Sequence, residues 1–190
     1  VHIWLEAGAH IVHYPVRGGK DVALVAIFQE PAQFDAWSTE ANGADVHDRI
    51  ATLAQPLQDL MRSASAWRKW SLFECPVPTH YTKGGIALLG DAAHPVLPFL
   101  AQGAVMALED ASVVAAEIAM TPGDIPSSLL RYEFNRRARV MRVQSASRRN
   151  GQIYHLSGLL AAARNGVLRA FPPERLMAGY DWLYGWTPPE

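Results

Sequence analysis

A short segment near the middle of the chain combines residue types that suit the binding of a polar cofactor. Gly90 ends the apolar run Ile86–Leu89, and Asp91 follows it directly. The run predicts a short buried strand, which would place Asp91 at the strand's carboxyl end, where α/β proteins bind ligands. A carboxylate there accepts hydrogen bonds from hydroxyl groups, and each such charge-assisted bond contributes about 1.5–3 kcal/mol.

The residues that follow predict a loop and then a helix. Pro98 keeps the chain extended, and Gly103 allows either a close approach of the backbone to another group or a positive φ. Apolar residues then recur at helical spacing, which predicts a helix over 104–120. The first amide groups of this helix would point toward the Asp91 turn. An acid facing a helix N-terminus indicates a ligand with hydroxyl groups and a developing negative charge.

This segment resembles the second flavin-binding motif of the single-component aromatic-ring monooxygenases, which include para-hydroxybenzoate, 3-hydroxybenzoate and salicylate hydroxylases. The residues that carry the resemblance are Gly90-Asp91-Ala92-Ala93-His94, Pro98, Gln102-Gly103 and Glu109-Asp110-Ala111. Their spacing is closer to the salicylate and 3-hydroxybenzoate branch. The resemblance implies FAD as cofactor and NADH or NADPH as co-substrate.

The resemblance also implies roles for individual residues around the flavin. Asp91 would accept hydrogen bonds from the ribityl hydroxyls, and the amides of Gly103, Ala104 and Val105 would face the pyrimidine edge of the ring. Pro98 matches a proline whose carbonyl lies near flavin and substrate. His94 has two equal interpretations. It contacts the flavin or the substrate, or its ring holds the loop by hydrogen bonds to backbone carbonyls.

Two β-rich runs near the start of the chain predict a β-hairpin. They cover residues 9–15 and 21–29 and flank Gly18-Gly19. Alternation along the first strand places His10 and Tyr14 on one face. The alternative to a functional role is that such side chains merely sit at a solvated sheet surface.

In the resembling family this sheet covers an aromatic substrate above the flavin. We therefore expect His10 to act as base or proton relay, with Tyr14 and Gln102 orienting a small phenolic acid. The implied reaction adds O2 to the reduced flavin at C4a, and the hydroperoxide then hydroxylates the ring. Removal of the phenol proton makes the ring electron-rich, which accelerates such a step by about 10²–10⁴-fold.

The rest of the chain predicts mainly structural elements. They are a helical turn around 34–37, a helix over 46–63 that Pro56 kinks or divides, extended structure over 67–78, helices over 128–154 and 156–171, and an aromatic tail at 180–186 that packs back onto the fold. The helix over 128–154 carries seven arginines. We expect most of them on a solvated face, and a nucleic-acid-binding helix is the weaker alternative.

Composition narrows the class of protein. The 190 residues carry a net charge of −1, which gives no general reason to expect binding to nucleic acid or to an anionic membrane. The single cysteine, Cys75, excludes an internal disulfide framework and favours a reducing compartment such as the cytoplasm. We expect no membrane span and no metal site, and leave a homodimer open.

The expected architecture is mixed α+β and α/β. It comprises the remainder of a substrate-binding domain (1–80), the strand–loop–helix of the second flavin motif (81–120) and a C-terminal helical segment (121–190). The resembling fold is that of para-hydroxybenzoate hydroxylase without its N-terminal Rossmann half, because Gly-x-Gly-x-x-Gly is absent and the chain begins with Val1. We therefore expect a carboxy-terminal fragment that is inactive alone. The alternative is a non-catalytic stand-alone module that binds a partner supplying the missing half.

Overall fold

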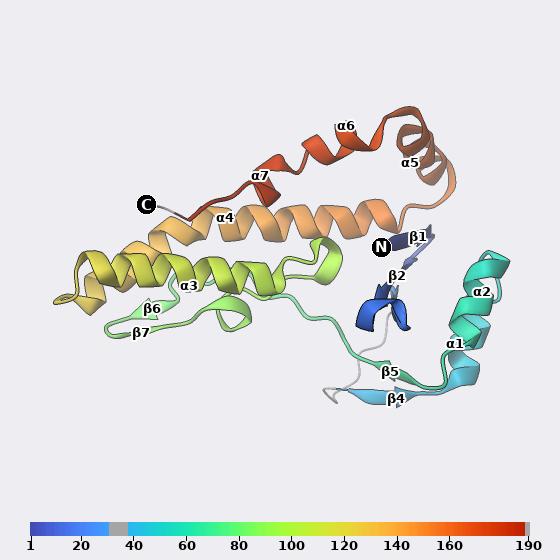
Figure 1. The fold of residues 1–190 in the computed structure, drawn as a ribbon, viewed down its shortest axis with the longest axis horizontal. Coiled ribbons are helices and arrows are strands. Elements are labelled where there is room, and N and C mark those ends of the chain that lie inside the picture. Colours follow the sequence, from blue (N-terminus) through green and yellow to red (C-terminus); the bar gives the residue numbers. More distant parts are fainter. Residues whose placement is uncertain (31–37, 189–190) are drawn as a thin grey trace. The chain divides into compact units, whose positions relative to one another are not determined.

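The computed structural model describes residues 1–30 and 38–188 (Figure 1). The helical turn expected around 34–37 lies outside these residues. The chain divides into two compact units. The first comprises Val1–Leu72 with Tyr154–Ala162, and the second comprises Phe73–Ile153 with Ala163–Glu190. Segments 81–120 and 121–153, expected as separate parts, thus lie in one unit.

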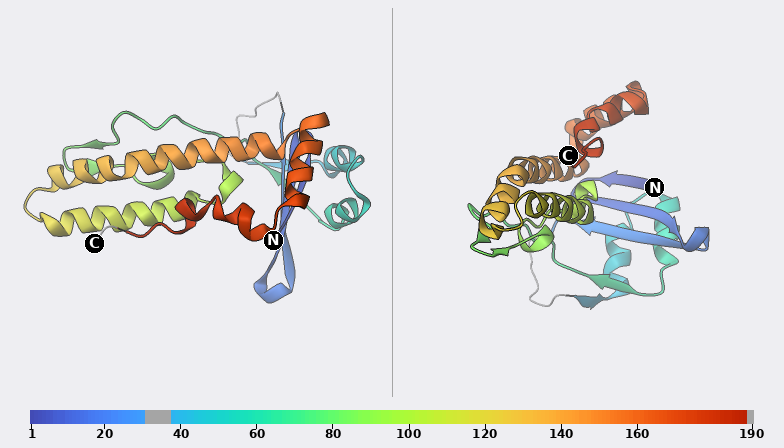
Figure 2. Two further views of the ribbon diagram at one scale, coloured as in Figure 1. Left: turned by 90° about the horizontal axis from the view of Figure 1, so that it is seen from above. Right: turned by 60° about the vertical axis from the view of Figure 1, so that its left-hand side comes forward.

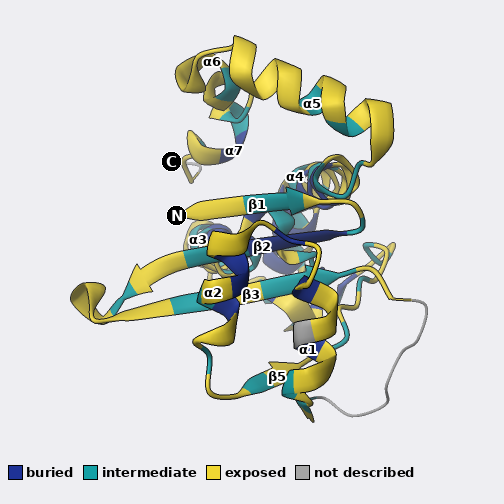
Figure 3. Cartoon of the chain, turned by 90° about the vertical axis from the view of Figure 1, so that its right-hand side faces the viewer, coloured by how far each residue is buried: buried dark blue, intermediate teal, exposed yellow. Residues whose placement is uncertain are grey.

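A three-stranded antiparallel sheet forms the centre of the first unit. Its strands are β1 (His2–Glu6), β2 (Ala9–Val16) and β3 (Asp21–Phe28), in the order β1-β2-β3. The β2–β3 pair confirms the predicted hairpin, whereas β1 was not predicted. Because β2 has a strand on both sides, its first residues are the most buried part of the sheet (Figure 3).

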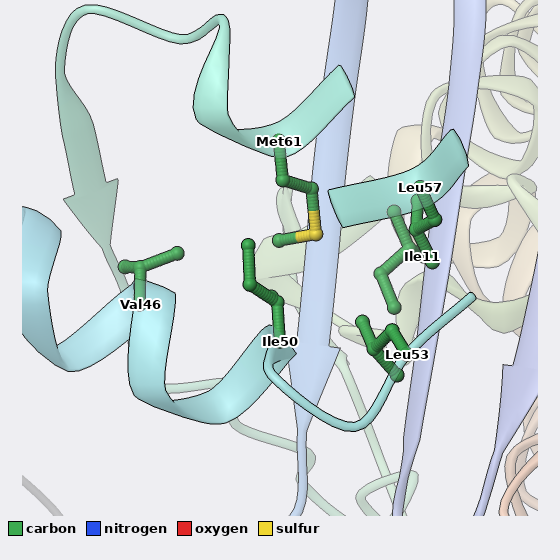
Figure 4. Packing of buried hydrophobic residues seen from close by; sticks show 6 residues of the cluster. All are labelled: Ile11, Val46, Ile50, Leu53, Leu57 and Met61. Carbon is green, nitrogen blue, oxygen red and sulfur yellow. The ribbon is translucent and has the colours of Figure 1, made fainter. Parts of the chain in front are cut away.

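Two short helices cover one face of this sheet. They are α1 (Gly43–Ile50) and α2 (Gln55–Arg62), and Pro56 lies in the first turn of α2. The proline therefore divides the predicted helix into two, since its ring fits only the start of a helix. The cluster between helices and sheet is Ile11, Val46, Ile50, Leu53, Leu57 and Met61, whose side chains point toward one another in Figure 4.

The segment predicted to be extended over 67–78 is a strand only at its start. β5 (Trp67–Lys69) pairs antiparallel with β4 (Thr39–Ala41). Residues 70–78 have no regular hydrogen-bonded structure. The two prolines Pro76 and Pro78 lack amide donors, which explains why a ladder does not continue there.

Two long helices dominate the second unit. α3 (Gly103–Met120) and α4 (Ile125–Tyr154) lie side by side and antiparallel, and all but the last residue of α4 belongs to this unit (Figures 1 and 2). Both helices were predicted from apolar spacing, with starts within a few residues of those observed. The loop between them spans only residues 121–124, which accounts for their antiparallel arrangement.

The predicted buried strand at 86–89 is wrong. β7 is limited to Ile86–Ala87, pairs only with β6 (Thr82–Lys83), and leaves Ile86 72% exposed. Within the part of the chain that the structure describes, no further strand or layer covers Ile86. Leu88 is likewise exposed. The apolar run therefore predicted burial of Ile86 and Leu88 that depends on a covering layer, and the run itself carries no information about that layer.

The C-terminal helices are α5 (Gly158–Ala170), α6 (Pro173–Ala178) and α7 (Asp181–Tyr184). The prediction that the aromatic tail packs back onto the fold is confirmed. Leu183 is buried with Val140 and Val143 of α4, and Trp182 packs against the same cluster. Among the helices that the structure describes, none is both long and apolar enough to cross a membrane.

Candidate functional site

The turn that carries Asp91 packs tightly against α3. Gly90 opens the single 3-10 turn η2 (Gly90–Ala92) at a φ of +55°, and its amide donates to the Asp110 carboxylate at 2.9 Å. A Cβ at Gly90 would lie 3.0 Å from the Cβ of Ala107. Glycine is therefore needed here both for the positive φ and for the close approach of turn and helix.

Asp91 lies beside the start of α3. Its Oδ1 is 3.8 Å from the position that a Cβ on Gly103 would take, and the residue is exposed. Within residues 1–30 and 38–188, the Asp91 carboxylate has no hydrogen-bond or ion-pair partner. This carboxylate is thus available to accept hydrogen bonds from a ligand.

The N-terminus of α3 has no side-chain cap. The side chain of Gln102, at the cap position, makes no hydrogen bond to the helix start. The first amides of a helix, here those of Gly103, Ala104 and Val105, have no acceptor within the helix. Ala104 and Val105 are exposed, so these donors and the positive end of the helix dipole remain available to a ligand. The alternative of a positive φ at Gly103 is wrong, since the positive φ occurs at Ala101.

Pro98 and Gln102 lie in the loop between turn and helix. Pro98 begins the 3-10 turn η3 (Pro98–Leu100), and its carbonyl accepts from the Ala101 amide at 3.1 Å. The Gln102 side chain is only 5% exposed, and its Nε2 donates to the Leu100 carbonyl at 3.4 Å. Its Oε1 has no hydrogen-bond partner among the described residues. A buried acceptor without a partner is costly, and a ligand that donates to it would remove that cost.

His94 ties the same loop to α3. Its Nε2 lies 2.6 Å from Oδ2 of Asp110, and both side chains are almost fully buried. His94 thus holds the loop through a side chain of α3 rather than through backbone carbonyls, and its Nδ1 has no hydrogen-bond partner among the described residues. Burial raises the pKa of Asp110, but hydrogen bonds from His94, from the Gly90 amide and from Arg136 outweigh it and lower this pKa. Asp110 is therefore a fixed anion that holds the Asp91 turn in place.

A buried group of charges connects this turn to α4. Arg136 of α4 is 1% exposed and bonds Asp110 and Glu109, each at 2.7 Å. Arg139 also contacts Glu109, with two bonds of 2.5 and 2.6 Å, and the ring of Trp186 lies 5.3 Å from both guanidinium groups. The expectation that the arginines lie mostly on a solvated face is therefore wrong for these two. Their charge is neutralised by carboxylates on α3.

The first unit contains the other predicted site residues, His10 and Tyr14. His10 is 2% exposed, and its Nδ1 lies 2.7 Å from Nε2 of His155. Burial, and to a smaller extent the neighbouring His155, lower the pKa of His10 to about 4. Tyr14 is 37% exposed and four residues along β2. At about 3.3 Å per residue the two lie about 13 Å apart, so they cannot contact the same substrate atom.

His155 is the residue that sequence reasoning missed. It follows the last residue of α4, and its carbonyl accepts from the Gly8 amide at 3.2 Å. The Tyr154 ring also lies edge-on to His10, with centroids 5.2 Å apart. Only the aromatic pair at the end of a long helix marks this position in the sequence. Because His155 and His10 are 145 residues apart in the sequence, no local pattern predicts their contact.

Sequence comparison relates this chain to known proteins. A sequence model described as an FAD binding domain matches residues 2–147. The 3-hydroxybenzoate 6-hydroxylase of Polaromonas naphthalenivorans (strain CJ2) is 33% identical over 187 residues, covering 97% of this chain and 46% of the relative. The salicylate hydroxylase of Pseudomonas putida is 30% identical over 192 residues, covering 96% and 43%.

Solved structures give the same result. A salicylate hydroxylase substrate complex matches with a TM-score of 0.80 and 27% identity, covering 97% of this chain and 46% of that one. Klebsiella pneumoniae HpxO complexed with FAD and uric acid matches with a TM-score of 0.77 and 25% identity, covering 93% and 46%. The chain thus spans less than half the length of these relatives. The expected fold, part of an FAD-dependent hydroxylase, is confirmed.

Proposed function

The chain belongs to the FAD-binding domain family, and on that premise we propose that it forms part of an enzyme that hydroxylates a small aromatic acid. NADH or NADPH supplies the electrons and O2 the oxygen atom. The observation that carries the proposal is the Asp91 carboxylate, which has no partner among the described residues, beside the uncapped start of α3. A flavin offers ribityl hydroxyls to such a carboxylate and an electron-rich ring edge to such amides.

The residues around the turn have distinct roles in this proposal. FAD, when bound, supplies the redox chemistry with O2. Asp91 accepts hydrogen bonds from its hydroxyls, and the amides of Gly103, Ala104 and Val105 donate to the ring edge. Because these amide dipoles are fixed in advance, they stabilise the negative charge of a reduced flavin. The Pro98 carbonyl lies in the same loop and provides a further acceptor toward flavin or substrate.

The substrate we propose is a hydroxybenzoate. Several relatives are named for such compounds, including 3-hydroxybenzoate, 3-amino-4-hydroxybenzoate and salicylate. His10 accepts the proton of the phenolic hydroxyl. Tyr14, about 13 Å along the strand, contacts the opposite end of the molecule. Gln102 accepts a hydrogen bond at its Oε1 and orients the ring.

The test is a measurement of coupling in the flavin-loaded protein that carries this chain. NAD(P)H oxidation, hydrogen peroxide release and hydroxylated product are measured with 3-hydroxybenzoate and with salicylate. His10→Ala leaves the phenol protonated and its ring less reactive, so more NAD(P)H is consumed to form hydrogen peroxide. Product formation is expected to fall by about 10²-fold or more.

His13→Ala is the matched control, since His13 lies on the opposite face of the same strand and stacks on His2. It is expected to leave coupling unchanged. Unchanged coupling and turnover in His10→Ala would remove His10 from the mechanism. Absence of flavin binding by the wild-type protein would contradict the proposal as a whole.

The proposal involves no nucleic acid. Arg131, Arg136 and Arg139 each bond a carboxylate of α3, and Arg137 donates to the carbonyls of Pro78 and Thr79. These side chains are therefore engaged within the protein rather than presented to phosphates. We propose the cytoplasm as location, in line with the single cysteine, and leave a homodimer as a partner to be tested.

A further inference from the structure

The contact between His10 and His155 links a buried imidazole to a partly exposed one. Nδ1 of His10 and Nε2 of His155 are 2.7 Å apart, which is a hydrogen-bond distance with one proton between two ring nitrogens. His10 is 2% exposed, whereas His155 is partly accessible. The pair therefore forms a path of two rings from the interior of the first unit toward its surface.

A buried imidazole alone makes a poor final acceptor for a proton. Burial lowers the pKa of His10 to about 4 and also lowers the pKa of His155. Near pH 7 neither ring therefore holds a second proton for long. When one ring nitrogen of His10 takes up a proton, the ring avoids a positive charge if its other nitrogen loses its own proton at the same time.

We propose that His155 is a positioning residue that relays the substrate proton from His10 to solvent. The proposal rests on the function proposed above, in which His10 accepts the phenolic proton. His155 acts in two ways. Its Nε2 holds the tautomer of His10 in which Nδ1 carries the proton and Nε2 is the base, and it then receives that Nδ1 proton.

The transfer balances in protons and charge. The O–H bond of the phenol breaks and its proton adds to Nε2 of His10. The Nδ1–H bond of His10 breaks and that proton adds to Nε2 of His155, while the Nδ1 proton of His155 passes to water. Both rings end neutral with exchanged tautomers, the substrate ends as a phenolate, and one proton has entered the solvent.

The surroundings of the pair favour neutral rings. His10 is opposite Leu5 on β1 and Ile27 on β3, both apolar. The Tyr154 ring lies edge-on to His10, and the backbone of His155 is fixed by the Gly8 amide. A relay that never charges either ring suits such surroundings.

A first test is the tautomer of each ring, measured by ¹⁵N NMR of the labelled chain at pH 7. The relay requires the proton on Nδ1 in both His10 and His155. A proton on Nε2 of His10 would overturn the proposal, because that nitrogen could then not accept a proton from a substrate. This readout does not depend on activity.

A second test measures the transfer itself in the flavin-loaded protein that carries this chain. The probe is a nitro-substituted hydroxybenzoate, whose phenolate absorbs visible light, mixed by stopped flow near pH 7. His155→Gln keeps an acceptor for His10 Nδ1 but cannot pass a proton on. The rate of phenolate formation is expected to fall about 10- to 100-fold, within the range of general base catalysis. Probe affinity and final absorbance stay unchanged.

The outcomes separate this inference from the proposed function. A wild-type rate retained by His155→Gln overturns the relay but leaves His10 as base. A loss of affinity or final absorbance in His155→Gln indicates a structural role only and also overturns it. His155→Phe, which removes the acceptor as well, is expected to be slower than His155→Gln, and His13→Gln is the unchanged control. If the wild-type protein binds the probe without ionising it, the proposed function itself fails.

Discussion

The imidazole of His10 shows how strongly burial changes the chemistry of one residue. The sequence placed it correctly on the hairpin and on the same face as Tyr14, because alternation along a strand depends only on local geometry. The sequence could not give its partner. His155 lies 145 residues along the chain from His10, and no local pattern encodes that contact.

The lowered pKa of His10 predicts a pH dependence of stability. In the unfolded chain this group titrates near 6.5, but in the folded state near 4, so between these values only the unfolded state binds the proton. The free energy of unfolding of the first unit therefore falls as pH decreases from 6.5 to 4. Each unit of pKa is worth about 1.4 kcal/mol, which gives a loss of about 3 kcal/mol.

This dependence is measured by urea denaturation at pH 7 and pH 4.5, followed by NMR signals of Ile11 and Ile50 in the core of the first unit. His10→Gln cannot bind the proton and is expected to remove most of the decrease. His80→Gln, at an exposed position of the second unit, is expected to retain it. A wild-type stability that does not change between the two pH values would contradict the assignment.

At the scale of elements, the pairing of α3 with α4 positions the Asp91 turn. Apolar spacing predicted both helices but assigned the arginines to solvent, because one helix considered alone does not show the charges of its neighbour. Arg136 is buried only because α3 supplies Asp110 and Glu109 opposite it. Through these contacts Glu109 and Asp110 hold α3 against α4, and Asp110 also holds the Asp91 turn.

Removal of Arg136 is expected to be strongly destabilising. Arg136→Met leaves two buried carboxylates with fewer partners, and breaking a buried ion pair in this way costs about 3–5 kcal/mol. Chemical denaturation measures the change in the free energy of unfolding. Arg149→Met, at an exposed position of the same helix, is the control and is expected to stay within about 0.5 kcal/mol of wild type. A loss below 1 kcal/mol in Arg136→Met would mean that this cluster does not hold the two helices together.

The short elements were the hardest to predict. β1, β6 and β7 have five residues or fewer, and the sequence marks them weakly. Their existence depends on a partner strand rather than on propensity. By contrast, Pro56 acts through its own ring, and the division of the helix at that residue was predictable.

At the scale of the whole molecule, the chain comprises two units, each with its own core, and the two sets of site residues are divided between them. His10 and Tyr14 belong to the first unit, whereas Asp91, Pro98, Gln102 and the start of α3 belong to the second. Motif spacing could group the residues that we propose for the flavin because they are close in sequence. A function shared by both sets is part of the proposal, since the chain spans 46% of the 3-hydroxybenzoate 6-hydroxylase relative and 46% of the salicylate hydroxylase chain.

The alternative, a non-catalytic module of the same fold, differs from the proposed enzyme in one respect. Both share the second unit, but only the enzyme requires Asp91 to hold a flavin. The exposed apolar residues Val105 and Leu108 on the outer face of α3 are compatible with either. Flavin binding is therefore the property that separates the two.

The most direct measurement is a titration of the protein that carries this chain with FAD, comparing wild type with Asp91→Ala. Loss of charge-assisted hydrogen bonds worth about 1.5–3 kcal/mol predicts an affinity about 10- to 150-fold weaker in the variant. Asp124→Ala, at an exposed acid near the start of α4, is the control and is expected to bind as wild type does. Equal affinity in Asp91→Ala, or no binding by the wild-type protein, would contradict the assignment of this turn as the flavin site.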